Sequence, residues 1–328
     1  MQNQERSAKW DNLKFVLIFM VVLGHILFPF RNESDLVKGL YVFIYMFHMP
    51  LFIFVSGLFS KTIIRKKQWN RVFSYLALYI FIRALDTFGT LVHKKKLRLN
   101  FFRTNGPDWY AMAVFLFLVI TIIFQKTRPL LLLSAALAVG LLAGYSDIPG
   151  NLFAFMRSCV FYPFFLLGYY ADRSLLEKYS KPDISVGAGI ILIALLLFFL
   201  VKGNDYYSFI GLLKAKKAYD EIGIMGHSGP LLRIAQYLGA MVTGLLLILS
   251  VPSKRTAFSV IGTKTLPIFV WHYLFLKIFW ALSGKKLVMA LFPETYMLIL
   301  LCMCMLVILF CSSYFFDRTN RIMDFANT

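Results

Sequence analysis

The sequence contains few charged residues, and acidic residues are the scarcest of them. Charged side chains make up 16% of the 328 residues, with 16 Asp or Glu against 35 Lys or Arg. Hydrophobic residues reach 59%, above the roughly 45–50% of a typical soluble domain, and the mean hydropathy is +0.70. Because this excess runs along the whole chain, the polar surface that soluble domains need is missing, and a soluble multidomain protein is excluded.

Short motifs of soluble enzymes are also absent. The four cysteines form no C-x-x-C pair and show no metal-ligand spacing, so we predict no metal site and assign the cysteines to packing. The sequence contains no G-x-S-x-G, Walker A or H-E-x-x-H pattern. Conventional hydrolases and NTPases therefore have no support.

Apolar blocks long enough to cross a bilayer follow one another along the chain, since a spanning helix needs roughly 20 mostly apolar residues. We expect an all-α, polytopic transmembrane bundle of about ten helices, forming a single membrane domain over residues 1–328 without an additional soluble domain. The expected location is the plasma membrane. The blocks are 13–30, 36–59, 72–92, 110–124, 130–145, 152–171, 184–201, 231–251, 266–282 and 287–316.

The net charge of +19 does not indicate a nucleic-acid partner, because the basic residues lie in short loops between apolar blocks. With the N-terminus inside, 18 Lys or Arg fall on the inner side, 13 on the outer side and 4 within or beside helices. This bias predicts that both termini are cytoplasmic. Two outer segments, 93–98 and 214–217, oppose the rule. They indicate either contact with anionic lipid headgroups or attraction of an anionic substrate.

The first predicted helix carries three ionisable residues, Asp11, Lys14 and His25. Lys14 and His25 are three helical turns apart, so they share a face and are separated by about 16 Å along the axis, and Asp11 lies close to that face. Ionisable residues inside membrane helices are costly and usually functional. A histidine there either exchanges protons during catalysis or braces neighbouring helices by a hydrogen bond, and the spacing leaves both alternatives open.

The second block contains His48 directly before Met49 and Pro50, followed by Ser56 and Gly57. Pro50 is expected to kink the helix, and a broken helix is tolerated at membrane depth only where it lines protein or a wet cavity. A basic cluster comes next and suits either a phosphate-rich cytosolic ligand or simple anchoring at the inner face. Its members are Lys61, Arg65, Lys66, Lys67 and Arg71.

Four further polar or aromatic residues lie in or beside later blocks. Arg83 and Arg157 do not lie close enough to a predicted helix end to establish that their side chains reach the membrane surface. Trp109 opens the fourth block, where membrane-interface anchoring is the default role. His272 follows Trp271 in the ninth block, and His93 and His227 are loop residues without an assigned role.

Taken in order, six motifs resemble the membrane-bound acyltransferase-3 family. Its first helix carries Arg or Lys, ten residues, then His, and Lys14 and His25 match. The other five motifs are the second-helix segment 47–59, the basic run that ends at Arg71, residues 106–110 around Trp109, residues 164–168, and residues 261–272. Ser74-Tyr75 stands where the family usually has Pro-Tyr. The nearest likeness is to the exopolysaccharide and fucose O-acetylase-like branch.

This resemblance implies an O-acyltransferase that moves an acetyl or similar short acyl group from cytosolic acyl-CoA to a hydroxyl of an extracytoplasmic or lipid-linked polysaccharide. Acetyl-CoA would be a co-substrate, with no tightly bound cofactor. The expected partners are acyl-CoA, the glycan or lipid-linked sugar acceptor and membrane lipids. The oligomeric state stays open.

The implied mechanism gives His25 the role of general base or transient acyl carrier. Lys14 and Asp11 would hold the inner end of the channel, Arg83 would stabilise the oxyanion, and His48 would carry a second proton or act as a brace. The basic cluster would bind the CoA phosphates, and Ser56, Trp109 and His272 are further candidates. The competing function is a transporter or flippase of a sugar or lipid, which buried His and Arg and a broken helix also fit.

Overall fold

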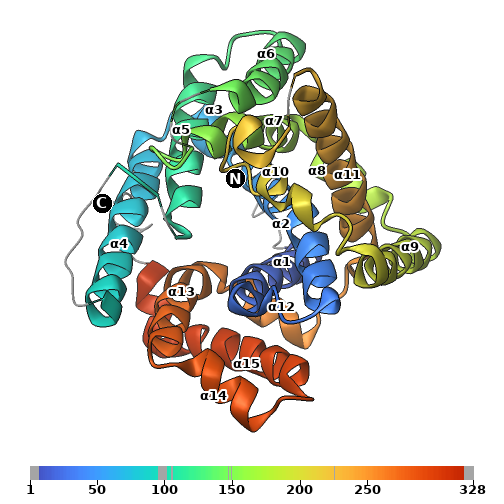
Figure 1. Cartoon of the computed structure of the whole chain (residues 1–328). Coiled ribbons are helices and arrows are strands. Elements are labelled where there is room, and N and C mark those ends of the chain that lie inside the picture. The colour runs from blue at the N-terminus through green and yellow to red at the C-terminus, as the bar shows by residue number, and fades with distance from the viewer. Residues whose placement is uncertain are drawn as a thin grey trace.

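The computed structural model describes residues 7–94, 102–104, 106–146, 148, 150–224 and 226–320 (Figure 1). Within these ranges the regular elements are helices, and an isolated β-bridge joins Arg103 and Leu152. Most of the predicted outer segment 93–98 lies outside the described residues. The all-α fold class predicted from the apolar blocks is therefore confirmed for this part of the chain.

Each predicted apolar block overlaps at least one helix. The main helices are α1 (Ala8–Leu27), α2 (Asp35–Phe59), α4 (Trp69–Lys94), α5 (Asp108–Ile123), α6 (Pro129–Leu142), α7 (Phe155–Tyr170), α9 (Pro182–Lys202), α11 (Ser228–Ser250), α13 (Thr265–Ala281) and α15 (Tyr296–Cys311). Short helices connect them: α3 (Lys61–Arg65), α8 (Arg173–Lys178), α10 (Ile210–Leu213), α12 (Ala257–Gly262), α14 (Gly284–Leu291) and α16 (Tyr314–Asp317). Single 3₁₀ turns are η1 (Phe28–Phe30), η2 (Ala143–Tyr145), η3 (Tyr207–Phe209), η4 (Asp220–Ile222) and η5 (Arg318–Asn320).

Five of the described helices are long and apolar enough to cross a membrane: α1, α2, α4, α9 and α11. A sixth span arises if α13 and α14, which meet at an angle of 71°, are taken together. Helices α5, α6 and α15 are apolar but shorter. The protein is thus a multi-pass membrane protein, while ten spans and two cytoplasmic termini stay predictions.

The last predicted block, 287–316, is wrong as a single helix. The chain ends α14 at Leu291 and starts α15 at Tyr296. Pro293 lies in this gap. Proline lacks a backbone N–H and its ring clashes with the preceding turn, which explains why the apolar run is divided there.

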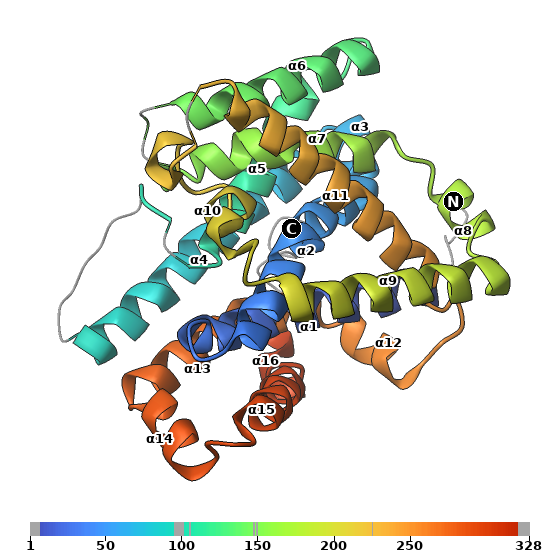
Figure 2. The same ribbon diagram turned by 45° about the vertical axis from the view of Figure 1, so that its right-hand side comes forward.

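Helices α1 and α2 lie at the centre of the molecule, and the other main helices surround them (Figures 1 and 2). Helix α2 packs mainly against α7, α9, α11 and α1, and α1 packs against α12, α13 and α15. Their central position explains why the largely apolar α1 is buried on most sides. Residues on these two helices are therefore held by neighbours from both halves of the chain.

Helix α2 runs unbroken through Pro50 and Gly57, and the kink expected at Pro50 stays a prediction. Gly57 lies where α2 and α7 are closest. A Cβ atom on Gly57 would collide with the Phe165 carbonyl, and one on Gly168 would collide with the Phe54 carbonyl. Small residues permit such close helix approach in membranes. Gly57 therefore permits the close packing of α2 against α7.

The N-terminal part of α1 is fixed by side-chain hydrogen bonds to the segment after α11. The Asn12 amide donates to the carbonyls of Pro252 and Lys254, both at 2.9 Å. Its oxygen accepts from the hydroxyls of Thr256 (2.7 Å) and Ser259 (2.6 Å). With every polar atom of its side chain satisfied, Asn12 sets the rotation of α1 and hence the direction of His25 further along it.

The segment 206–218 lies between α9 and α11. It forms only the turn η3 and the four-residue helix α10. Buried Arg233 on α11 donates to the Leu212 carbonyl at 2.6 Å, and the Tyr219 amide donates to the Gly144 carbonyl at 2.7 Å. These bonds fold the segment back onto the helices, and Lys214 follows directly after α10.

Candidate active site

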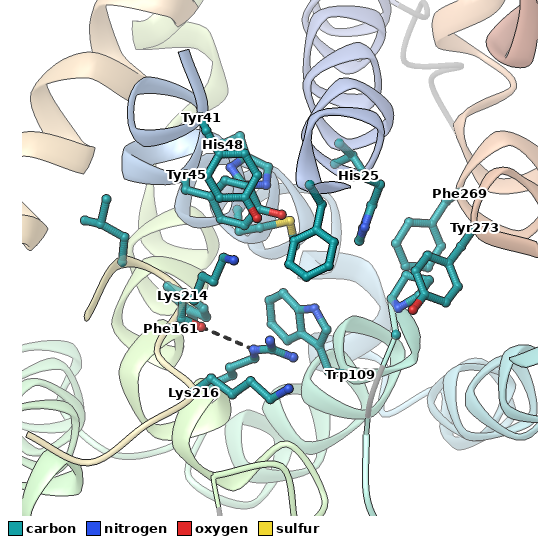
Figure 3. Close-up of a pocket in the computed structure, with 17 residues that line it drawn as sticks. His25, Tyr41, Tyr45, His48, Trp109, Phe161, Lys214, Lys216, Phe269 and Tyr273 are labelled. Atoms are coloured by element: carbon teal, nitrogen blue, oxygen red, sulfur yellow. Dashed lines mark hydrogen bonds between the residues drawn. The ribbon is translucent and has the colours of Figure 1, made fainter. Parts of the chain in front are cut away.

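A cavity of about 200 Å³ lies between α1, α2, α5, α7, α13 and the segment that follows α10 (Figure 3). It lies where α1 ends and where α5 and α7 begin. It is lined by Val21, His25, Phe28, Tyr41, Tyr45, His48, Met49, Gly106, Pro107, Trp109, Arg157, Phe161, Leu213, Lys214, Lys216, Phe269 and Tyr273. Convergent polar groups in a mainly aromatic pocket are typical of a binding or active site.

His25, in the last turn of α1, extends into this cavity (Figure 3). Two residues of α13 lie against its ring: the centroid of the Tyr273 ring is 5.2 Å away and that of the His272 ring 5.3 Å away. His25 is partly accessible from the cavity, whereas His272 is fully buried behind it. The predicted candidates His25 and His272 are thus brought together from opposite ends of the sequence.

The hydrogen bond of His272 fixes its tautomer. Its Nδ1 lies 2.8 Å from the Ile268 carbonyl oxygen. A carbonyl only accepts, so Nδ1 carries the proton and Nε2 presents a lone pair. In the described structure Nε2 is buried without a hydrogen-bond partner. Buried polar atoms are nearly always paired, and His25 is the histidine whose ring lies next to this atom's ring.

His48 on α2 is held in the same way. Its Nδ1 donates to the Ile44 carbonyl at 2.6 Å, which leaves Nε2 as an acceptor. The ring packs edge-on against Tyr45 at 4.8 Å, and Tyr45 packs against Tyr41 at 4.3 Å. The structure therefore places His48 at the cavity that His25 lines, with its ring held in one orientation.

Three cations line the cavity on the side away from α13. Lys214 Nζ lies 4.7 Å from the centre of the Tyr41 ring and 4.8 Å from that of Tyr45. Arg157 stacks over Trp109 at 4.7 Å, and its Nε donates to the Lys214 carbonyl at 3.3 Å. Lys216 completes the group (Figure 3). Trp109 therefore supports a cation at the cavity, beyond the membrane-interface role expected from its position.

The sequence indicated these cations only weakly. The run 214–217 stands out in the sequence only because it opposes the positive-inside rule, and Arg157 only because it lies inside an apolar block. Neither signal places them beside His25, since that depends on how the segment after α10 folds back. Tyr41, Tyr45 and Tyr273 carried no signal at all, because tyrosine is common in membrane proteins.

Arg83 lies outside the residues that line the cavity, within a buried ion-pair network. Its Nη1 is 3.2 Å from Asp86 Oδ2 and 3.3 Å from Asp108 Oδ2. Lys277 of α13 pairs with Asp86 at 2.5 Å. The second oxygen of Asp108 accepts from the Gly106 amide at 2.8 Å. The network joins α4, α13 and the start of α5, and so positions Trp109.

Lys14 and Asp11 lie near the other end of α1. Lys14 Nζ is 3.5 Å from Asp11 Oδ1 and 4.6 Å from the centre of the Phe59 ring. Helix α3 starts two residues after Phe59. The structure therefore brings Lys14 and the basic cluster to the same end of α1, away from the cavity.

Members of the basic cluster differ in exposure. Arg65, Lys66, Lys67 and Arg71 are exposed. Lys61 is half-buried and donates to the Ala171 carbonyl. Burial and the neighbouring charge of Arg65 lower the pKa of Lys61. The four exposed members are thus accessible at the surface, whereas Lys61 is tied to the backbone.

Ser56, the remaining candidate, lies away from the cavity lining. Its hydroxyl is 2.6 Å from the Tyr110 hydroxyl and donates to the Phe52 carbonyl at 2.8 Å. A second cavity, of about 710 Å³, lies among α5, α6 and α7, and no charged side chain lines it. Among the described residues no three His, Cys, Asp or Glu side chains gather as metal ligands. The chemistry-bearing groups therefore concentrate around His25.

The sequence profile of the acyltransferase domain family, the acyltransferase-3 family suggested by the motifs, matches residues 7–316. The chain belongs to this family. The match covers nearly the whole chain, including the first-helix pair Lys14 and His25 and every element that lines the cavity.

Two curated proteins that are similar to this chain are both named nodulation protein NolL. The protein of Sinorhizobium fredii (strain NBRC 101917 / NGR234) is 28% identical over 192 residues, which are 53% of this chain and 50% of that protein. The protein of Mesorhizobium japonicum (strain LMG 29417 / CECT 9101 / MAFF 303099) is 25% identical over 183 residues, 50% of this chain and 47% of that protein. The chain thus spans about half the length of the curated relatives it matches. No solved structure shows significant similarity to it.

Proposed function

We propose that this protein is a plasma-membrane O-acyltransferase that moves an acetyl or similar short acyl group from acyl-CoA to a hydroxyl of an extracytoplasmic or lipid-linked polysaccharide. The observation that carries the proposal is His25, placed by the family's own first-helix motif at a polar cavity beside two further histidines. Family membership supports the acyl-transfer chemistry, and the cavity supplies a base where the chemistry needs one.

In the proposed reaction, His25 accepts the proton of the acceptor hydroxyl while its oxygen attacks the thioester carbonyl. The carbon–sulfur bond then breaks, and the proton on His25 passes to the leaving thiolate. The products are the O-acyl ester and CoA with a free thiol. In the second version of the mechanism, His25 attacks the thioester carbonyl, the carbon–sulfur bond breaks, and the thiolate leaves while the acyl group stays on the imidazole. The acceptor hydroxyl then attacks this acyl group, the bond to His25 breaks, and the hydroxyl proton ends on the thiolate.

His272 acts as a positioning residue in this mechanism. Its Nδ1–H is occupied by the Ile268 carbonyl, so its Nε2 can only accept a hydrogen bond. If His25 donates one N–H to that acceptor, its other nitrogen keeps the lone pair that a base needs. The arrangement follows the logic of a catalytic base oriented by a third group. His48 offers a second acceptor across the cavity.

The donor reaches this site from the opposite end of α1. We propose that about ten helices cross the membrane with both termini cytoplasmic, which puts α3 in the cytosol and the cavity toward the outer leaflet. The CoA phosphates bind Arg65, Lys66, Lys67 and Arg71, with Lys61 held to the backbone beside them. The pantetheine arm passes Lys14 and Asp11 and covers the roughly 16 Å along α1 to His25.

Arg83 is proposed to hold Asp108 and the start of α5, because its pairs with Asp86 and Asp108 keep it behind the cavity.

The test of the function is acetyl-CoA consumption by the purified full chain in lipid nanodiscs, followed as thiol release with and without added glycan acceptors. Acetyl transfer supports the proposal. If the protein in vesicles instead moves a sugar or lipid across the membrane without cleaving the thioester, the result would support a transporter.

A further inference from the structure

We infer that the cavity contains an anion subsite, formed by Arg157, Lys214 and Lys216, that binds a carboxylate or phosphate group carried by the acceptor. The inference rests on the proposed function and names its substrate class, an acidic sugar or sugar phosphate. The three cations come from two parts of the chain, α7 and the segment after α10, and face one space with His25 (Figure 3).

The donors of this subsite are available. Arg157 lines the cavity, donates its Nε–H to the Lys214 carbonyl and stacks its guanidinium on Trp109. The guanidinium fork suits bidentate recognition of a carboxylate or phosphate. Lys214 contacts its neighbours through the faces of aromatic rings, which provide no hydrogen-bond acceptor for its ammonium group.

Among the described residues that line the cavity, none carries a carboxylate. Asp108, which interacts with Arg157 electrostatically, is engaged elsewhere through Arg83 and the Gly106 amide. Arg157 and Lys216 thus share the field of one carboxylate that is already paired with Arg83. Partly buried cations are costly in a membrane protein and normally pair with an opposite charge of their own. Three cations in a space of about 200 Å³ therefore indicate a small anionic group rather than a neutral sugar.

The position of the subsite also separates it from the donor. The basic cluster of α3 lies at the Lys14 end of α1, whereas Arg157, Lys214 and Lys216 surround the His25 end. An acceptor held by its anionic group would present a neighbouring hydroxyl to His25. The arrangement thus selects both the charge of the acceptor and the hydroxyl that is acylated.

Lys214 makes the subsite sensitive to pH. Burial, with the charges of Arg31, Arg157 and Lys216, lowers the pKa of Lys214 to about 7. The other titratable groups that face it are His25, His48, Tyr41 and Tyr45. Because the amine loses its charge as pH rises through this pKa, anion affinity falls across neutral pH, and binding above it takes up a proton.

The test uses the full chain in nanodiscs and three probes of similar size: glucuronate, glucose 1-phosphate and neutral glucose. Binding is measured by calorimetry for the wild type and for the Lys214→Gln/Lys216→Gln double variant. We expect at least one anionic probe to bind the wild type roughly tenfold or more tightly than glucose. One hydrogen bond to a charged group typically improves affinity by about that factor. The double variant should lose this preference.

Two controls keep the result interpretable. Lys286→Gln removes an exposed lysine far along the sequence and should leave the preference intact, and Lys214→Arg/Lys216→Arg should retain it because the charge is kept. Acetyl-CoA affinity should not change in the double Gln variant. If the double Gln variant still prefers the anionic probes, or if it loses only its affinity for acetyl-CoA, the proposal of an anionic acceptor would be overturned. Wild-type protein that binds anions but neither binds nor cleaves acetyl-CoA would instead overturn the proposed function.

Discussion

The imidazole rings of His25 and His272 lie with their centroids 5.3 Å apart, although 247 positions separate them in the sequence. The Nδ1 of His272 is bound to a backbone carbonyl, and its Nε2 is buried without a hydrogen-bond partner in the described structure. One histidine is thus presented to the cavity and the other is held behind it as an acceptor.

This pair predicts different effects for two substitutions of His272. His272→Leu removes the acceptor, which costs about 1–3 kcal/mol when a buried donor is left unpaired, and kcat should fall roughly 10- to 100-fold. His272→Gln places an amide oxygen where Nε2 was and should lose less. Steady-state kinetics with acetyl-CoA measures both, with KM values near wild type. Equal losses in both variants would argue against an acceptor role.

The exposed members of the basic cluster predict a donor-binding phenotype. Arg65→Gln/Lys66→Gln should raise the KM for acetyl-CoA several-fold and leave kcat unchanged, because the phosphates are bound equally in the ground and transition states. Raising the salt concentration should weaken wild-type binding by screening these charges.

The matched control for the basic cluster is Lys126→Gln/Arg128→Gln. These two exposed basic residues lie in another loop predicted to be cytoplasmic. The control variant should keep the wild-type KM for acetyl-CoA. If both double variants raise KM equally, the effect would come from general surface charge instead of a site at α3.

The ion pair of Arg83 and Asp108 predicts a stability phenotype. Arg83 is 3% exposed and Asp108 fully buried, and removing one partner of such a pair costs about 3–5 kcal/mol. Arg83→Met should therefore lower the thermal unfolding temperature in detergent, and Arg83→Met/Asp108→Asn should regain part of it.

Activity per folded molecule separates this role from oxyanion stabilisation. The double variant should retain most of the wild-type kcat, since Arg83 lies outside the cavity lining. A well-folded double variant without acetyl transfer would show that Arg83 acts on the reacting atoms, as first predicted from the sequence.

The contact between α2 and α7 predicts the effect of two glycine substitutions. Gly57→Ala places a Cβ against the Phe165 carbonyl, and such overpacking costs about 1–3 kcal/mol. Gly187→Ala, in α9, meets no atom within 4 Å and should be neutral or stabilising because alanine favours the helix. Thermal unfolding of both variants checks the prediction, and similar unfolding temperatures would contradict the close approach.

Much of the fold was predictable from the apolar blocks. A block that crosses lipid must satisfy its backbone hydrogen bonds internally, and a helix does so. The exceptions concern where an apolar run is interrupted. Pro293 divides the last block into α14 and α15, because proline cannot continue a helix. Helix α2, in contrast, runs on through Pro50.

The candidate site was predictable only in part. His25 followed from its phase with Lys14 and from the family motif, because both are properties of one helix. The pair between Arg83 and Asp108 and the position of Lys214 depend on contacts between residues 25 and more positions apart, which no local pattern records. His48 and His272 were identified as candidates, but their fixed tautomers require the helix carbonyls that the structure shows.

The most direct test of the account is acetyl transfer by the His25→Ala variant, purified in nanodiscs and compared with wild type and with His227→Ala. His227 is an exposed histidine in the segment before α11, outside the cavity, and serves as the matched control. Loss of a general base typically costs 10²- to 10⁴-fold in rate, so we expect a fall of about that size in His25→Ala and none in His227→Ala. Acetyl transfer at the wild-type rate by folded His25→Ala protein would contradict the central claim.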